Sequence, residues 1–163
     1  MPATYDAIAT TTLSSTTHSF TFSSIPQTYT DLILVQQGSI TVANGDAVLQ
    51  FNGDAANNYS RTYIYGSGSS AGYGRNAPID AAYGTYWNTN PCNAIWHIMN
   101  YSSTSVFKAI LTRNNSVTTP TTYTGVGTWR STSAITSIAC IVAEWNKDWV
   151  SGTTFTLYGI KAA

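Results

Sequence analysis

The stretch TTFTLYGIKAA, at Thr153–Ala163, has the pattern that decides the fold of this chain. From Thr154 to Gly159, hydroxyl-bearing side chains alternate with phenylalanine, leucine and glycine. A period of two residues is typical of a β-strand that has one buried face and one face in water. The stretch also holds almost no group that could carry out chemistry, and both features recur along the chain.

Segments with strand character follow one another along the sequence, and none has convincing helical periodicity. An Asn-Gly pair within Ala43–Asp46 predicts a tight hairpin. The one long segment without such a pattern, Ser67–Asn93, is expected to be a functional loop or to contain an unrecognised strand. The predicted strands are Tyr5–Leu13, His18–Ile25, Asp31–Ile40, Ala47–Gly53, Asn58–Gly66, Ala94–Ser102, Val106–Asn114, Thr124–Thr132, Ile135–Trp145 and Thr153–Lys161.

These nine or ten short strands predict an all-β fold, an antiparallel β-sandwich of the jelly-roll type. A chain of 163 residues is long enough for one domain with a buried core, and it shows no internal repeat. We therefore expect a single domain over residues 1–163, in which residues 1–16 could act as an N-terminal arm.

The composition excludes several classes of protein. Only 9% of the residues are charged, where soluble domains average about 25%, and the seven basic and seven acidic residues cancel. The 13% aromatic content excludes a disordered chain. The basic residues are scattered singly, which argues against nucleic acid as a partner, and no apolar run is long enough to insert into a membrane. A surface with so little charge favours association, so we expect a homo-oligomer.

The N-terminal residues lack the basic start and apolar core of a signal peptide, so synthesis in a cytoplasm is expected. Cys92 and Cys140 could form one disulfide, but a cytoplasmic origin favours two buried free thiols. Two cysteines and two distant histidines make a poor metal site, and no cofactor is expected.

Nucleophilic catalysis would need a base, and His18 and His97 are the two histidines. Each lies in a predicted strand beside large apolar residues, and no Gly-x-Ser-x-Gly motif is present, so a structural role is favoured for both. A glycosidase would need paired carboxylates. Glu144 and Asp148 lie close to Trp145 and Trp149 in a run that resembles a sugar subsite, but a solvated turn is favoured. We therefore expect no enzymatic activity.

Two further segments are candidate binding sites. The segment Phe51–Asn58 concentrates oxygen donors of the kind that calcium takes, although its spacing favours an ordinary hairpin loop. Aromatic side chains in the long segment could face a sugar or a protein partner, because their rings are amphipathic. A subunit interface is favoured for them over a host glycan site, and the contact residues predicted in this way are Tyr73, Tyr83, Tyr86 and Trp87.

Five blocks of the sequence, in this order and over nearly the whole chain, resemble one family, the virion structural modules of tailed bacteriophages, especially those of cyanobacteria and other aquatic bacteria. The blocks are IATTTLSSTTHSFTFSSIPQTYTDLILV (Ile8–Val35), FNGDAANNYS (Phe51–Ser60), HIMNYSSTSVFKAIL (His97–Leu111), TWRSTSAITSI (Thr128–Ile138) and GTTFTLYGIKAA (Gly152–Ala163). The resemblance implies a non-enzymatic β-sandwich found in capsid decoration and tail-fibre proteins. Ser67–Asn93 is the part that departs most from the family, so any partner specificity carried there stays open.

The resemblance leads to an expected place on the particle. A single module without a trimerising shaft fits a capsid decoration (cement) protein better than a tail fibre, so we expect it on the exterior of the virion head. There it would be a trimer seated on the major capsid protein or other virion proteins. The alternative is a tail-fibre or head-appendage adhesin that binds host-surface glycan, with the four aromatic residues named above as its contacts.

Overall fold

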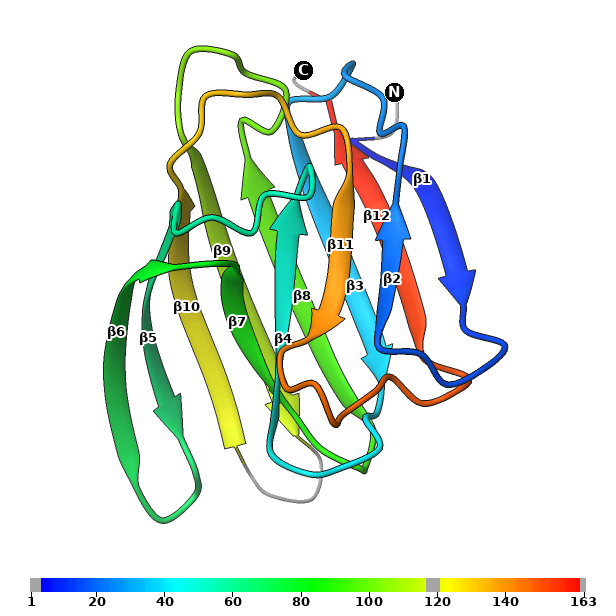
Figure 1. Ribbon diagram of the computed structural model, residues 1–163, viewed down its shortest axis with the longest axis vertical. Helices are drawn as coiled ribbons and strands as arrows, with labels where there is room; N and C mark the ends of the chain where they lie inside the picture. The colour runs from blue at the N-terminus through cyan, green and yellow to red at the C-terminus, as the bar shows by residue number, and fades with distance from the viewer. Residues whose placement is uncertain (1–3, 117–120, 162–163) are drawn as a thin grey trace.

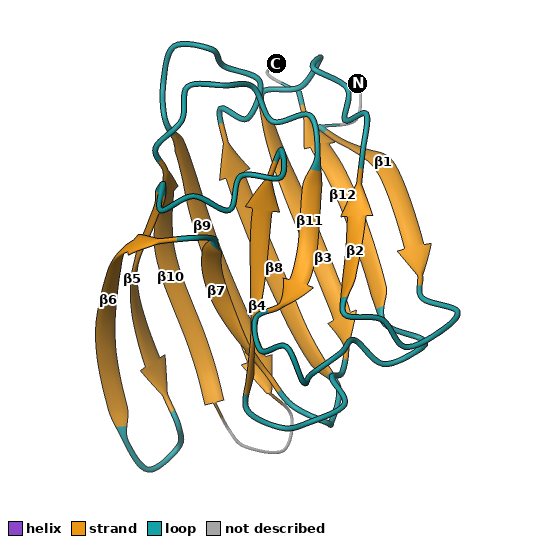
Figure 2. Cartoon of the chain, viewed as in Figure 1, coloured by secondary structure: helices purple, strands orange, loops and turns teal. Residues whose placement is uncertain are grey.

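The computed structural model describes residues 4–116 and 121–161, which form two antiparallel β-sheets packed face to face (Figures 1 and 2). These residues contain only strands, turns and loops, and none of them lies in a helix that could cross a membrane. The strands are β1 (Tyr5–Thr12), β2 (Ser19–Phe22), β3 (Asp31–Gly38), β4 (Gly45–Phe51), β5 (Tyr59–Gly66), β6 (Ala71–Ile79), β7 (Ala82–Trp87), β8 (Cys92–Met99), β9 (Lys108–Ser116), β10 (Thr121–Trp129), β11 (Ile138–Val142) and β12 (Thr154–Ile160).

The order of the strands is that of a jelly roll. The large sheet has the order β1-β12-β3-β8-β9-β10-β5-β6, and the small sheet has the order β2-β11-β4-β7. The chain crosses from one sheet to the other at every connection between consecutive strands except β5–β6, β8–β9 and β9–β10. These crossings interleave two Greek keys, which is the arrangement that defines a jelly roll. The predicted fold class is confirmed, with twelve strands rather than nine or ten.

Two insertions widen the large sheet. The hairpin β5–β6 is inserted between β4 and β7, and the hairpin β9–β10 between β8 and β11. Both add to the same edge, because β8 pairs with β9 and β10 pairs with β5. Figure 1 shows the β5–β6 hairpin extending beyond the small sheet, so the inner face of this hairpin is only partly covered.

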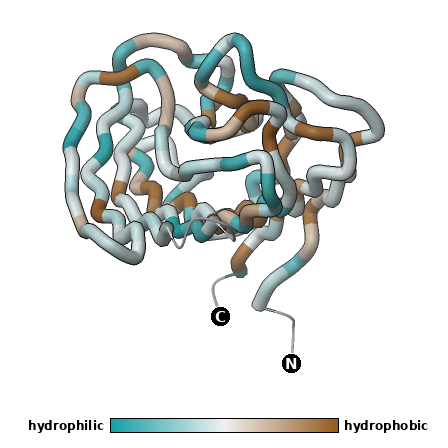
Figure 3. The backbone as a smooth tube through the Cα atoms, turned by 90° about the horizontal axis from the view of Figure 1, so that it is seen from below, coloured by the Kyte–Doolittle hydropathy of each residue, from teal (hydrophilic) through white to brown (hydrophobic). Residues whose placement is uncertain are grey.

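The space between the sheets is filled mainly by aromatic side chains. Trp149, from the connection between β11 and β12, is one of them, with its ring edge-on to Trp87 at 4.9 Å and to Phe155 at 5.3 Å between ring centroids. Buried indole N–H groups find acceptors, as Trp96 does on the Gln36 side-chain oxygen at 2.7 Å. In Figure 3 the strongly hydrophilic residues are few and scattered, as the low charge of the sequence requires.

The long segment Ser67–Asn93 holds two strands that the sequence patterns did not predict, β6 and β7. Gly72 and Gly74 interrupt the alternation in β6, yet their missing side chains are what allow it to pair. A Cβ at Gly72 would lie 2.6 Å from the Tyr65 ring, and one at Gly74 would lie 2.4 Å from the Tyr63 ring. Glycine inside a strand often marks such a close approach.

The predicted hairpin at Ala43–Asp46 is wrong. Asn44 does adopt the left-handed conformation of a tight turn, with φ of 64°. The strands on either side of this turn, β3 and β4, lie in different sheets, so the turn carries the chain across the sandwich. The segment 1–16 contains β1, which pairs with β12 at the edge of the large sheet. The backbone N–H of Lys161 donates to the carbonyl of Thr4, so the two ends of the described chain lie side by side (Figure 3).

The two cysteines lie in opposite sheets and are both buried and free, which confirms that expectation. Burial raises the pKa of the Cys140 thiol to about 12, so the thiol stays protonated at neutral pH.

Candidate functional site

The outer face of the large sheet is more apolar than a sheet face in water usually is. On β10, β9, β8 and β3, Val126, Leu111, His97 and Ile33 stand in register across the sheet. Ile64, Leu111 and Val126 are 59%, 40% and 53% exposed. An antiparallel sheet with one solvated face normally presents polar side chains there. An exposed apolar patch of this kind marks an interaction surface.

We call this surface the apolar outer face. It is defined by the outward-facing side chains Ile33, Val35, Ile64, Ile95, Leu111 and Val126.

The apolar outer face carries little charge. At the outward positions of β12, β3, β8, β9, β10 and β5, which are all described, the charged or titratable groups other than tyrosine are Asp31, His97 and Arg113. His97 Nε2 lies 2.9 Å from the Asp31 carboxylate, whose other oxygen accepts the backbone N–H of Asn100 at 2.8 Å. Asp31 and His97 are thus engaged with each other, and Arg113 is the remaining charged side chain at these outward positions, so a partner surface needs little charge complementarity.

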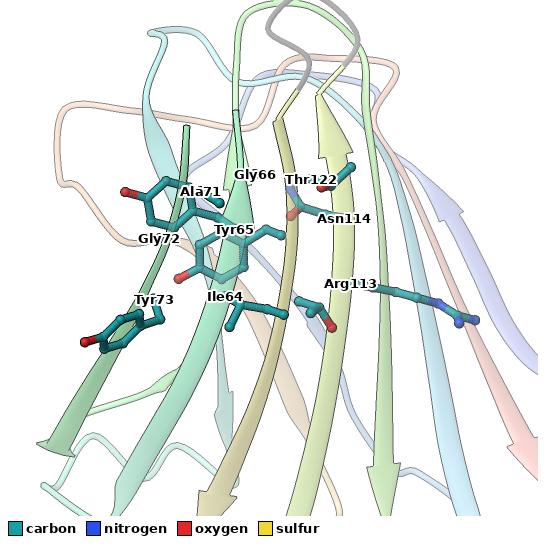
Figure 4. A pocket seen from close by; sticks show the side chains of 11 residues that line it. Ile64, Tyr65, Gly66, Ala71, Gly72, Tyr73, Arg113, Asn114 and Thr122 are labelled. Carbon is teal, nitrogen blue, oxygen red and sulfur yellow. The ribbon is translucent and has the colours of Figure 1, made fainter. Parts of the chain in front are cut away.

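A large hollow lies at the end of this face, against the β5–β6 hairpin. It has a volume of about 780 Å³ and is lined by residues from β5, β6, β9 and β10. Figure 4 shows Ile64, Tyr65 and Tyr73 gathered on the hairpin, while the Arg113 side chain extends away from them. The hollow extends the apolar outer face and holds no cluster of reactive groups.

The four aromatic residues predicted as contacts do not form one surface. Tyr73 is 87% exposed on the outer side of β6. Tyr83 and Tyr86 are half-buried on β7, where the Tyr86 hydroxyl donates to the Asn44 side-chain oxygen. Trp87 is completely buried against Trp149. The prediction of Trp87 as a contact residue is therefore wrong, because its ring belongs to the core.

A second hollow lies on the inner side of the β5–β6 hairpin, facing the edge of the small sheet. Its volume is about 380 Å³. We call it the tyrosine cavity, and it is lined by Asp46, Arg61, Tyr63, Tyr65, Ser67, Tyr86, Thr121 and Tyr123.

Arg61 is held in place inside the tyrosine cavity. Its Nε donates to the Asn76 side-chain oxygen at 3.0 Å, and its guanidinium lies 4.6 Å from the Tyr63 ring centroid and 5.0 Å from that of Tyr83. Arg61 Nη2 is 4.0 Å from the Asp46 carboxylate, too far for a hydrogen bond. Burial raises the pKa of Asp46, against the opposing influence of Arg61. The cavity thus holds a charged pair whose hydrogen-bonding capacity is partly unused.

The two candidate glycosidase carboxylates, Glu144 and Asp148, are engaged within the fold. Glu144 accepts the backbone N–H of Asp46 at 3.2 Å, and Asp148 lies 3.4 Å from His18 Nδ1. His18 Nδ1 also lies 2.9 Å from the carbonyl of Lys147. Trp145 is 89% exposed while Trp149 is buried, so the two rings cannot face one sugar.

The oxygen-rich segment Phe51–Asn58 uses its donors and acceptors to tie loops together. Asn52, with φ of 54°, accepts the backbone N–H groups of Thr136 and Ser137 at 2.8 and 3.1 Å. Asp54 accepts Trp129 Nε1 at 2.7 Å. Among the residues that the structure describes, no three His, Cys, Asp or Glu side chains lie close enough to hold a metal ion.

The ionisation of Asp54 should make the stability of the fold depend on pH. Burial alone would raise the pKa of its carboxyl, but hydrogen bonds from Asn58, Trp129 and the Ala56 backbone together lower that pKa below the ordinary 3.8. A carboxyl with a lowered folded-state pKa contributes stability that is present above its unfolded pKa and lost as pH falls through the folded one. We expect thermal melts below about pH 4 to lose stability less steeply in Asp54→Asn than in the native protein. Parallel pH profiles of the two would contradict this assignment.

The sequence carried one overlooked signal for the tyrosine cavity. Tyr63 and Tyr65, two positions apart, are followed across a turn by Gly72 and Gly74, also two positions apart. That pattern is typical of a hairpin in which rings cover glycines. Asp46 and Tyr123 line the cavity from other strands, and no local sequence pattern indicates that they do.

No protein-family model matches the chain, and no curated protein shows significant similarity to it, so its surfaces are what indicate its function.

Proposed function

We propose that this protein is a non-enzymatic structural protein of a tailed-phage virion, a capsid decoration protein on the exterior of the head. In this proposal it forms a homo-oligomer, a trimer, and binds the major capsid protein. The observation that carries the proposal is the apolar outer face, a broad sheet surface with three exposed aliphatic side chains and little charge.

The size of this face suits such a role. Six strands about 4.8 Å apart and about 23 Å long present roughly 650 Å² of flat area. A stable protein interface takes about 800 Å² from each partner, so this face with its rim is large enough for one subunit contact. Binding to many equivalent sites on an assembled shell would then stabilise the shell, because the protein binds the assembled form in preference to loose subunits.

Cryo-electron microscopy of intact particles, labelled with an antibody against this chain, tests the location. Label over the icosahedral head is the expected result, and its copy number would give the oligomer. Particles without label would overturn the proposal. Label on the tail alone would also overturn it, in favour of the adhesin.

Leu111→Lys and Val126→Lys should each weaken rebinding of the purified protein to particles stripped of it, by about tenfold or more. Each change would bury an unpaired charge in the contact. Both side chains are exposed in the free subunit, so the melting temperature should stay close to that of the native protein.

Val42→Lys is the matched control for these variants. Val42 is 45% exposed, close to the 53% of Val126, but it lies in the loop between β3 and β4. Sedimentation of particles with added protein would measure all three variants. Equal binding by Val42→Lys and Leu111→Lys would show that the apolar outer face is not the contact.

A further inference from the structure

The tyrosine cavity has the features of a small-molecule site, and none of them is needed for decoration. Its volume of about 380 Å³ lies at the lower end of the range for ligand pockets, which is about 300 to 1,000 Å³. It lies on the inner side of the β5–β6 hairpin, away from the apolar outer face. A ligand could therefore occupy it while the outer face is covered by a partner.

The aromatic wall of the cavity is built in advance. The Tyr63 ring stacks on the Tyr123 ring at 4.8 Å, with 20° between the planes. The rings of Tyr63 and Tyr65 lie against β6, where the glycines described above leave room for them. Rings that are already fixed lose little side-chain entropy when a ligand binds. Tyr65, 36% exposed, keeps surface available for a ligand at the mouth of the cavity.

The polar groups of the cavity, Asp46 and Arg61, face each other at a distance that one ligand hydroxyl can bridge. Asp46 Oδ2 and Arg61 Nη2 are 4.0 Å apart, so a hydroxyl placed between them can donate to the first and accept from the second. Arg61 Nη1 is buried and has no hydrogen-bond partner within the described chain, so the guanidinium has an unused donor. Unused hydrogen-bonding groups beside aromatic rings suit a ligand with many hydroxyls and an apolar face.

The charge of the cavity decides between neutral and acidic ligands. Asp46 and Arg61 cancel, and Glu144 lies close behind, bonded to the backbone of Asp46. Glu144 in turn lies 3.7 Å from Lys147 Nζ, so the two carboxylates and the two cations balance and offer no excess positive charge to a carboxylated or phosphorylated ligand. A neutral ligand needs no such charge.

We propose that the tyrosine cavity binds a neutral pyranose, the terminal residue of a saccharide, with its apolar face on Tyr65 and hydroxyls between Asp46 and Arg61. The inference is independent of where the protein sits on the particle, so its failure would leave the decoration proposal standing.

Saturation-transfer NMR and calorimetry of the purified protein with neutral hexoses, N-acetylhexosamines and their short oligomers test the proposal. We expect at least one neutral saccharide to bind with a millimolar or lower dissociation constant. Backbone amide shifts should change mainly around the lining residues, a readout that needs no variant. Absence of binding, or shifts confined to other parts of the molecule, would overturn the proposal. Tighter binding of uronic or sialic acids would overturn the assignment to neutral sugars.

Tyr65→Ala should weaken binding about tenfold, because it removes the exposed ring face. Tyr73→Ala is the matched control: it removes a tyrosine from the same hairpin on the opposite side of the sheet, and binding should be unchanged. Equal effects of the two variants would mean that the cavity is not the site.

Asp46→Asn separates a binding role from a structural one. Because burial raises the pKa of Asp46, the stability gained from its protonated form is present at low pH and lost as pH rises, so the ionised carboxylate is a cost to folding at pH 7. The variant should melt at the same or a higher temperature while losing most saccharide binding. Unchanged binding would remove Asp46 from the site.

Discussion

Replacing Trp149 by alanine is expected to lower the free energy of unfolding by about 3 to 5 kcal/mol, the range for removing a large aromatic side chain from a core. Trp149 is fully buried, packs edge-on against Trp87 and Phe155, and donates its indole N–H to the carbonyl of Cys140 at 3.2 Å. The backbone of Trp149 also bridges to Thr17, which precedes β2, and to Ile40, which follows β3. Alanine keeps the bridges but leaves a cavity between the sheets.

Trp145→Ala is the control for this experiment. Trp145 lies four positions earlier in the sequence and is 89% exposed, so its removal should change stability by no more than about 0.5 kcal/mol. Urea unfolding followed by circular dichroism measures both variants. Similar losses in the two would mean that the Trp149 ring does not stabilise the core.

Lys108→Met should lower the free energy of unfolding by about 2 to 3 kcal/mol. Lys108 is completely buried at the start of β9, and its Nζ donates to the carbonyls of Ser103, Val106 and Thr132 at 2.7, 2.9 and 3.1 Å. Methionine fills the same space but leaves these carbonyls without their donor, which costs more than the net value of the hydrogen bonds. The loss is limited because burial, which lowers the pKa of Lys108, also makes its charge costly to keep.

Lys161→Met provides the comparison, since Lys161 is exposed and its ion pair with Asp6 lies at the surface. The denaturation midpoint of Lys161→Met should equal that of the native protein. A Lys108→Met variant more stable than the native protein would show that the desolvation of the ammonium group outweighs its three hydrogen bonds.

Alternation, or a continuous apolar run as in Asp31–Ile40, predicted the strands whose inner faces lie in the core. Thr153–Lys161 and Asp31–Ile40 were found close to their observed bounds, because each strand has one face against the small sheet. The pattern did not predict β6, because the inward positions of this strand include glycines, which are covered by rings from β5. Its pairing is decided by the neighbouring strand, which a pattern within one segment cannot show.

The position of each aromatic residue was harder to predict than its strand. Trp87, Trp145 and Trp149 all lie near turns or strand ends, yet Trp145 alone is exposed. Their burial depends on how the turns fold back over the sandwich. The tyrosine cavity joins residues from β4, β5, β7 and β10, and the order of these strands follows from two insertions that local sequence patterns do not reveal.

The inserted β5–β6 hairpin has a consequence for how this protein could change. The eight strands of the two Greek keys bury most of the core, whereas Tyr65 and Ser67 belong to the insertion and its turn. Mutations at these positions can therefore accumulate without destabilising the eight-stranded jelly roll. A library randomised at Tyr65, Ser67 and Thr121 should yield many folded members with altered recognition, so the protein can serve as a scaffold for directed evolution.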